Sequence, residues 1–155
     1  MGWVWSIARM TVLGPSNVRE KISTIQRGWR RQMDIRAALK ELCEAFNAHD
    51  LDRIMAFFSD DCVLQMPRGS RPWGSRFEGK RNVREALATR FEGLPDVHYG
   101  NDEHFVDAAA DTGISKWTLA GTTREGTRKE VQGCDFYTFR NGKVIRKDSY
   151  WKIVD

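Results

Sequence analysis

Two carboxylates and a tyrosine in the last quarter of the chain are the residue types best suited to do chemistry. In the stretch 129–151 two alternating, strand-like runs flank Asn141-Gly142, a dipeptide that favours the two-residue type I′ turn of a β-hairpin. A regular hairpin with this turn pairs Asp135 with Asp148 and places both on the same face as Tyr137. Two buried carboxylates at this distance do not both ionise easily, so one of them would titrate high and serve as an acid near neutral pH. The alternative is that one carboxylate lies exposed at the rim of the sheet, or that Arg146 or a lysine neutralises the pair.

A possible metal site is suggested by His98, Asp102 and His104, which alternate along one predicted strand. At about 3.3 Å rise per residue, the two histidines of a straight strand lie roughly 20 Å apart, which is too far for one ion. We therefore expect no metal, and nothing in the sequence calls for another cofactor. His104 alone stays a candidate base because histidine titrates near neutral pH. Its alternative is a histidine at the rim of the sheet.

The hydrophobic pattern predicts the elements that must position these residues. Apolar residues recur at helical spacing after Asp34, again after a second capping residue, Asp50, and again over 83–91, with a short strand at 62–66. Four strand-like runs follow, joined by short polar links, so consecutive strands should pair antiparallel. This order predicts an α+β fold in which a curved antiparallel sheet wraps around about three helices and forms a cone.

Large apolar side chains predict what such a cone would hold. The chain has six tryptophans in 155 residues. Pockets that are mostly apolar with a few polar groups bind small apolar or aromatic molecules. The residues expected to line the pocket are Phe46, Phe58, Met66, Trp73, Phe91 and Trp117. Core packing is the alternative for each of them. The other face of the hairpin carries Phe136, Ile145 and Trp151, which predicts a homodimer through the sheet.

Charge is concentrated in the N-terminal segment. The formal net charge is +4, but residues 1–32 hold six Lys or Arg against one acid, which leaves about −1 for the remainder. A nearly neutral domain argues against a nucleic-acid partner, and no segment is long enough to span a membrane. We expect residues 1–32 to be a basic leader, either poorly ordered or upstream sequence read as protein, and residues 33–155 to be the domain. Three cysteines without CxxC spacing favour a cytoplasmic protein with reduced thiols.

The order of elements and three sequence stretches resemble the nuclear transport factor 2-like superfamily, closest to its SnoaL-like and ketosteroid-isomerase-like branch. The stretches are 46–52 (FNAHDLD), 57–62 (FFSDDC) and 135–144 (DFYTFRNGKV). The resemblance runs from about Asp34 to Asp155 and implies a cystatin-like cone fold for residues 33–155. These motifs are specific for the fold and do not name a substrate.

The resemblance implies three catalytic positions of the ketosteroid isomerases, of which this chain retains one. Their general base, an Asp before a Pro, is Met66 here, and the oxyanion-hole Tyr of their first helix is Leu42. Their second oxyanion donor, an Asp kept protonated by an apolar site, corresponds to Asp135. Ketosteroid isomerisation by the family's route is therefore not what these residues imply.

The polyketide cyclases and epoxide hydrolases of the same fold also share only some of their catalytic residues with this chain. The cyclases also work through an Asp at about the position of Asp135, but their His after a Gly-Thr is Thr123 here. The epoxide hydrolases have an Arg two residues before an Asp, where this chain has Gly133. The resemblance thus implies the fold and an Asp of interest, and no complete mechanism.

Two functions stay open from the sequence. The first is a SnoaL-like, cofactor-independent acid/base enzyme on a small apolar substrate, of isomerase, cyclase, dehydratase or hydrolase type. Its candidate catalytic residues are Asp135, Asp148, Tyr137 and His104. The second is a non-catalytic module that binds a hydrophobic small molecule in the cone or only dimerises. Met66 at the position of the isomerase base favours the second, and Asp135 beside a second carboxylate favours the first.

Overall fold

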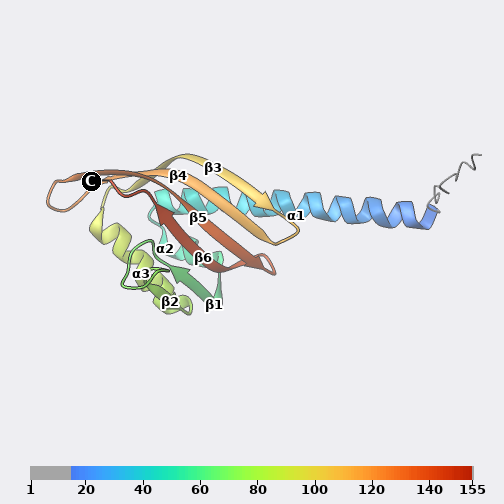
Figure 1. Ribbon diagram of the computed structural model, residues 1–155, viewed down its shortest axis with the longest axis horizontal. Helices are drawn as coiled ribbons and strands as arrows, with labels where there is room; N and C mark the ends of the chain where they lie inside the picture. The colour runs from blue at the N-terminus through green and yellow to red at the C-terminus, as the bar shows by residue number, and fades with distance from the viewer. Residues whose placement is uncertain (1–14, 155) are drawn as a thin grey trace, which may run out of the picture.

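The longest element of the chain is its first helix. The computed structural model describes residues 15–154, so the first 14 residues of the predicted leader lie outside it. Helix α1 runs without a break over Pro15–Asn47, and its N-terminal half extends away from the body of the molecule (Figure 1). The predicted start at Asp34 is therefore wrong. A Pro suits the first helical turn, and the residues between it and Asp34 carry an apolar period of their own that continues the helix.

Two shorter helices complete the helical layer. Helix α2, Leu51–Ala56, begins as predicted at Asp50, whose side chain accepts a hydrogen bond from the Arg53 backbone N–H. Helix α3 spans Lys80–Gly93 and lies against β1. In the described part of the chain, every helix is too short or too polar to cross a membrane.

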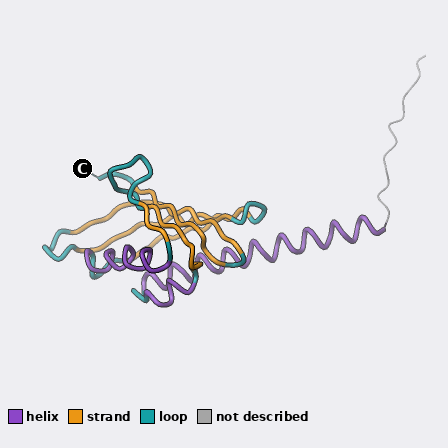
Figure 2. The backbone as a smooth tube through the Cα atoms, turned by 90° about the horizontal axis from the view of Figure 1, so that it is seen from below, coloured by secondary structure: helices purple, strands orange, loops and turns teal. Residues whose placement is uncertain are grey.

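Within residues 15–154, six strands form one sheet, with the order β2-β1-β6-β5-β4-β3. Strands β3 to β6 pair antiparallel in sequence order, as predicted, and β1 lies parallel to β6. The helices lie on one side of the curved sheet (Figure 2), which confirms the α+β cone. The strand bounds are Phe58–Gln65 for β1, Arg76–Glu78 for β2, His98–Asp107 for β3, Thr112–Thr122 for β4, Arg128–Arg140 for β5 and Lys143–Trp151 for β6.

The β5–β6 hairpin has the predicted turn but not the predicted register. Asn141 and Gly142 both have positive φ, at 52° and 74°. Phe139 pairs with Val144, but the next pair joins Thr138 to Arg146, so β6 contains one extra residue at Ile145. This β-bulge shifts every later pair, and Asp135 faces Ser149 instead of Asp148. The predicted pairing of the two carboxylates is wrong for this reason.

The main core lies between the helices and the inner face of the sheet. The buried stripe of α1 packs against buried residues of β5 and β6. Its members are Ile35, Leu39, Leu42 and Phe46, and the strand residues are Tyr137, Phe139 and Val144. The same inner face carries Asp135, so its carboxylate is placed inside the cone.

Candidate functional site

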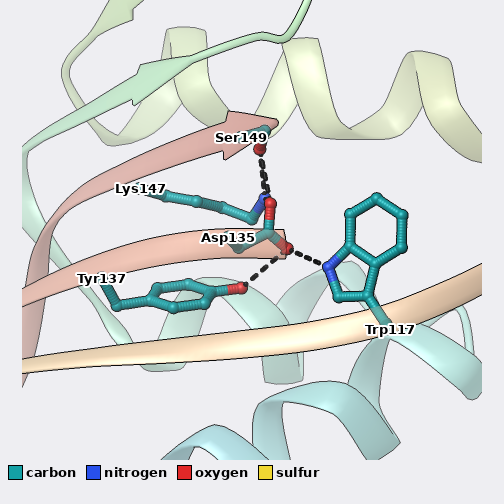
Figure 3. Close-up of polar contacts among 5 residues, drawn as sticks. All are labelled: Trp117, Asp135, Tyr137, Lys147 and Ser149. Carbon is teal, nitrogen blue, oxygen red and sulfur yellow. Dashed lines mark hydrogen bonds and ion pairs between the residues drawn. The ribbon is translucent and has the colours of Figure 1, made fainter. Parts of the chain in front are cut away.

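A buried ion pair occupies the inside of the cone (Figure 3). Lys147 Nζ lies 2.5 Å from Asp135 Oδ1, and the two side chains are only 7% and 6% exposed. Lys147 also lies near two aromatic rings, with Nζ 5.9 Å from the Phe46 centroid and 5.6 Å from that of Tyr137. A charge removed from water in this way must be paired and hydrogen-bonded to be tolerated.

Three further donors complete the environment of Asp135. Ser149 Oγ donates to Oδ1 at 2.6 Å and itself accepts from Lys147 Nζ at 2.7 Å. On the other carboxylate oxygen, Trp117 Nε1 donates at 2.9 Å and the Tyr137 hydroxyl at 3.4 Å. The carboxylate therefore accepts from four donors, which matches the number of its lone-pair positions. We call these five residues the polar cluster.

Two local features of the strands build this cluster. The bulge at Ile145 turns Lys147 and Ser149 to the inner face, beside Asp135. Gly133 pairs with Trp117 across β4 and β5, and a Cβ there would overlap the Trp117 ring and the carbonyl oxygen of Tyr150. The missing side chain thus lets the indole lie over β5 and reach the carboxylate.

Burial shifts the pKa values of the donors in opposite directions. Burial lowers the pKa of Lys147 below its usual value, and the neighbouring Asp135 charge opposes this shift. Burial raises the pKa of Tyr137 well above its ordinary value, and the Asp135 charge adds to this effect. Tyr137 therefore stays protonated as a hydrogen-bond donor, whereas Lys147 is a stronger acid than an exposed lysine. Burial also raises the pKa of the nearby Cys43 thiol to about 12, so it is not a nucleophile near neutral pH.

A series of adjoining cavities lies between the polar cluster and the surface. Two inner cavities of about 20 Å³ each are lined by Asp135, Lys147 and Trp117, and each has room for about one water molecule. A larger outer groove of about 500 Å³ lies between the loop after β1, helix α3 and the end of β6. Met66 and Trp151 line both the groove and the first inner cavity. The groove, the first inner cavity and the second inner cavity therefore adjoin in this order between the surface and the ion pair, and we call this series of spaces the path.

The predicted catalytic residues divide between the two faces of the sheet. Asp135 and Tyr137 lie together in the polar cluster. Asp148 lies on the outer face, where Arg146 donates to its Oδ2 at 2.8 Å and the Tyr150 hydroxyl at 3.3 Å. The structure does not bring Asp148 to Asp135, because the bulge moves it to the opposite side.

His104 is separated from the inner cavities by one side chain, that of Ser115. Its Nδ1 is 3.0 Å from Ser115 Oγ, and its Nε2 is 3.1 Å from Asp102 Oδ2. Ser115 lines the second inner cavity and pairs with Asp135 in the sheet, but His104 does not itself line a cavity. Burial lowers the pKa of His104, with Asp102 opposing the shift. Among the residues that line the second inner cavity, His104 therefore contacts Ser115.

The six predicted ligand-binding residues divide between the lining of the inner cavities, the core and an exposed loop. Phe46, Met66 and Trp117 line the inner cavities. Phe58 is fully buried in the core, and Phe91 packs against the cores near the His49 ring. Trp73 is 54% exposed in the loop after β1 and lines neither the groove nor the inner cavities.

Lys147 and Ser149 are the functional candidates that sequence reasoning missed. A regular hairpin places Lys147 on the outer face, so the bulge had to be known first. The sequence offers a weak signal, because bulges are frequent next to active sites and the alternation Lys147, Ser149, Trp151 becomes an inner face once one is allowed.

Comparison with known proteins places this geometry in a family. The sequence profile of the SnoaL-like domain matches residues 39–147. No curated protein matches the chain at a significant level of sequence similarity. A candidate polyketide cyclase from Xanthomonas campestris is 16% identical, with a TM-score of 0.71 over 79% of this chain and 93% of the other. A candidate isomerase from Bacillus subtilis is 15% identical, with a TM-score of 0.67 over 81% and 88%.

A third solved structure carries the superfamily description. It is an NTF2-like protein of unknown function from Mesorhizobium loti, 18% identical, with a TM-score of 0.66 over 79% of this chain and 94% of the other. Identities this low show a shared fold alone. The family is shown by the profile, which covers well over half of the chain. The chain therefore belongs to the SnoaL-like domain family, in agreement with the resemblance of its sequence.

Proposed function

We propose that this protein is a cofactor-independent enzyme that transfers protons on a small apolar carbonyl compound. In this proposal Lys147 exchanges the proton and Asp135 is its fixed counter-charge. The observation that carries it is the buried Asp135–Lys147 pair at the inner end of a path from the surface. Ionisable groups with shifted pKa values that line a cavity are typical of catalytic sites. The cyclase and isomerase descriptions of structures with the same fold agree with this class of reaction.

Lys147 is the better proton carrier of the two. The Asp135 carboxylate already accepts from four donors, so none of its lone-pair positions is left to take a proton from a substrate. Among the described residues, Lys147 Nζ donates to two acceptors, Asp135 and Ser149, which leaves one of its three N–H groups for a substrate. Its lowered pKa also brings it closer to the working pH, where acid/base catalysis is most efficient.

The proposed step is an enolisation in which every proton is accounted for. The ammonium group of Lys147 donates a proton to the carbonyl oxygen of the substrate. The amine that results takes a proton from the carbon next to the carbonyl group, which gives the enol and restores the ammonium group. Asp135 exchanges no proton in this step and serves as the counter-charge of the Lys147 ammonium group. Enolisation is the first step of both carbonyl isomerisation and aldol-type cyclisation.

The test follows exchange of carbon-bound protons, which requires no knowledge of the natural substrate. Aryl ketones are incubated with the protein in D₂O, and loss of the α-proton signal is followed by NMR. Lys147→Arg keeps a positive charge and hydrogen-bond donors but does not release a proton near neutral pH. We expect exchange to fall by about 10²- to 10⁴-fold in this variant. Lys143→Arg, at an exposed position of the same strand, is the matched control and should exchange like the wild type. Exchange that survives in Lys147→Arg would exclude the proposed role.

A binding module is the second candidate, and the size of the inner cavities favours it. Each has room for about one water molecule, and Met66 stands where the isomerases of this fold have their base. In this case the same ketones would raise the melting temperature of the wild type without exchanging their α-protons. That combination would make binding without chemistry the function of the cone.

A further inference from the structure

We infer that the outer groove holds a flat, apolar organic acid whose carboxylate binds Arg90, assisted by Arg68, beside Trp151 at the boundary between the groove and the first inner cavity. The inference rests on the proposed function, because it names the ligand class for the same path. Its first observation is the arrangement around Trp151. The Arg90 guanidinium carbon lies 4.8 Å from the Trp151 ring centroid, and that of Arg68 lies 5.3 Å from it. Stacking on an indole holds a guanidinium in place while its N–H groups remain able to bind both oxygens of a carboxylate.

These two guanidinium groups have no carboxylate partner within the described part of the chain. Both guanidinium groups stack on the Trp151 ring. Arg84, on the same helix as Arg90, differs because its guanidinium lies 2.8 Å from the Asp52 carboxylate. Glu85 also lines the groove, but it is exposed and lies 3.9 Å from Arg81. An arginine at a concave site that forms no ion pair of its own is matched by an anionic ligand.

The charge balance inside the path points the same way. Arg90 lines the first inner cavity together with Lys147 and Asp135, so two cations face one carboxylate there. Burial is the main cause of the lowered Lys147 pKa, and repulsion by the Arg90 charge adds to it. A ligand carboxylate at Arg90 would offset this repulsion and supply the missing negative charge.

The volumes indicate how such a ligand would lie. The groove of about 500 Å³ suits a small organic molecule and offers the apolar side chains of Met66, Phe77 and Ala86. The inner cavities accept only a group the size of a water molecule. The ring system therefore lies in the groove beside Trp151, its carboxylate binds Arg90, and the carbonyl oxygen and the carbon next to it reach Lys147 through the two inner cavities.

The experiment compares two probes that differ in charge alone. 4-Acetylbenzoate and 4-acetylbenzamide have nearly the same shape and the same ketone, and their dissociation constants are measured by calorimetry at low salt. We expect the wild type to bind the carboxylate at least about tenfold more tightly, as for a charge-assisted hydrogen bond. Arg90→Gln should reduce this ratio to about one by weakening the benzoate alone. Arg68→Gln should reduce it less because Arg68 is exposed.

Controls separate this inference from the proposed function. Arg84→Gln removes a cation from the same helix and should keep the wild-type ratio. Lys147→Arg should also keep it, so a variant without proton exchange can still show the carboxylate preference. A wild type without preference, a ratio unchanged in Arg90→Gln, or a ratio lost in Lys147→Met but kept in Arg90→Gln would each overturn the inference.

Discussion

The two faces of the β5–β6 hairpin each carry an Asp with a basic partner. The two pairs differ in burial and in the number of their hydrogen-bond partners. On the inner face, Asp135 and Lys147 are 6% and 7% exposed and share their hydrogen bonds with three other side chains. On the outer face, Asp148 and Arg146 are 15% and 49% exposed. Similar distances of 2.5 and 2.8 Å therefore join groups in very different environments.

The comparison shows that pairing alone does not identify a functional carboxylate. In the outer pair the Arg146 side chain is about half exposed, so water screens the attraction between the two charges. The inner pair has lost its water and depends on a complete set of protein donors. A reacting group can use a proton held in such a place, because the surrounding dipoles are already oriented.

The largest expected effect comes from removing the inner cation. Lys147→Met leaves the Asp135 carboxylate buried without its charged partner, so we expect the free energy of unfolding to fall by about 3–5 kcal/mol. Urea denaturation at pH 7 measures this loss. On the outer face, Arg146→Met should cost only about 0–1 kcal/mol.

A double variant sharpens this first prediction. Asp135→Leu combined with Lys147→Met removes both charges, so most of the stability lost in Lys147→Met should return. Equal losses in Lys147→Met and Arg146→Met would show that the two faces do not differ as described. A double variant less stable than Lys147→Met would show that the carboxylate stabilises the fold without the lysine.

The next effect concerns the donor that reaches Asp135 from β4. In Gly133→Ala the new Cβ would overlap the Trp117 ring, so the indole must move away from the carboxylate. We expect a loss of about 1–3 kcal/mol, as for an overpacked core. Gly93→Ala is the control, because a Cβ at the end of α3 meets nothing within 4 Å. Gly133→Ala with wild-type stability would mean that the position of Trp117 is not fixed by Gly133.

A smaller effect is expected from His104, at the edge of the inner site. Its pKa is lowered by burial, with Arg36 and Lys40 adding to the shift and Asp102 opposing it. The unfolded chain therefore takes up the proton first, and stability should fall as the pH drops below about 6.5, by no more than about 1.4 kcal/mol per pH unit.

Paired denaturation curves at several pH values test this sign. His104→Gln keeps a polar contact to Ser115 and cannot titrate, so its stability should change less between pH 7.5 and 5.5. His98→Gln, on an exposed residue of the same strand, should follow the wild type. A His104→Gln protein with the full wild-type dependence would assign the effect to other groups.

The hairpin also shows which part of the site the sequence could predict. Asn141-Gly142 determined the turn through local backbone preference, and the alternation of β5 correctly placed Asp135 and Tyr137 inside. The bulge at Ile145 could not be predicted, because it depends on how β6 fits both of its neighbours in the sheet. One extra residue exchanges the two faces of β6, so Lys147 was missed and Asp148 was placed opposite Asp135.

Helix α1 gives the same lesson for the fold. Its C-terminal half was predicted from the stripe Ile35, Leu39, Leu42 and Phe46, which is buried. Its N-terminal half carries a stripe of the same spacing, Val18, Ile22, Ile25 and Trp29, which is exposed. Periodicity predicts that a helix is amphipathic, but the covering partner is a property of the assembled molecule.

The smallest effect on folding, and the sharpest test of the outer face, concerns Phe136 and Tyr150. Both are about half exposed, at 46% and 54%, and their rings meet edge to face with centroids 5.6 Å apart. We propose that this face joins two copies through a two-fold contact. The sequence predicted such a dimer through Phe136, Ile145 and Trp151, but the bulge moves Trp151 to the inner cavities and brings Tyr150 to the outer face. Light scattering at micromolar concentration should then return a dimer for the wild type and a monomer for Phe136→Asp. The Phe136 ring is about half exposed in one chain. The free energy of unfolding of the Phe136→Asp monomer should therefore lie within about 0.5 kcal/mol of that of the wild type at a concentration where it is monomeric. Trp73→Asp removes an equally exposed ring from a loop and should remain dimeric. A wild-type monomer would leave the outer face without a partner, and the difference between the two faces would then be one of solvation alone.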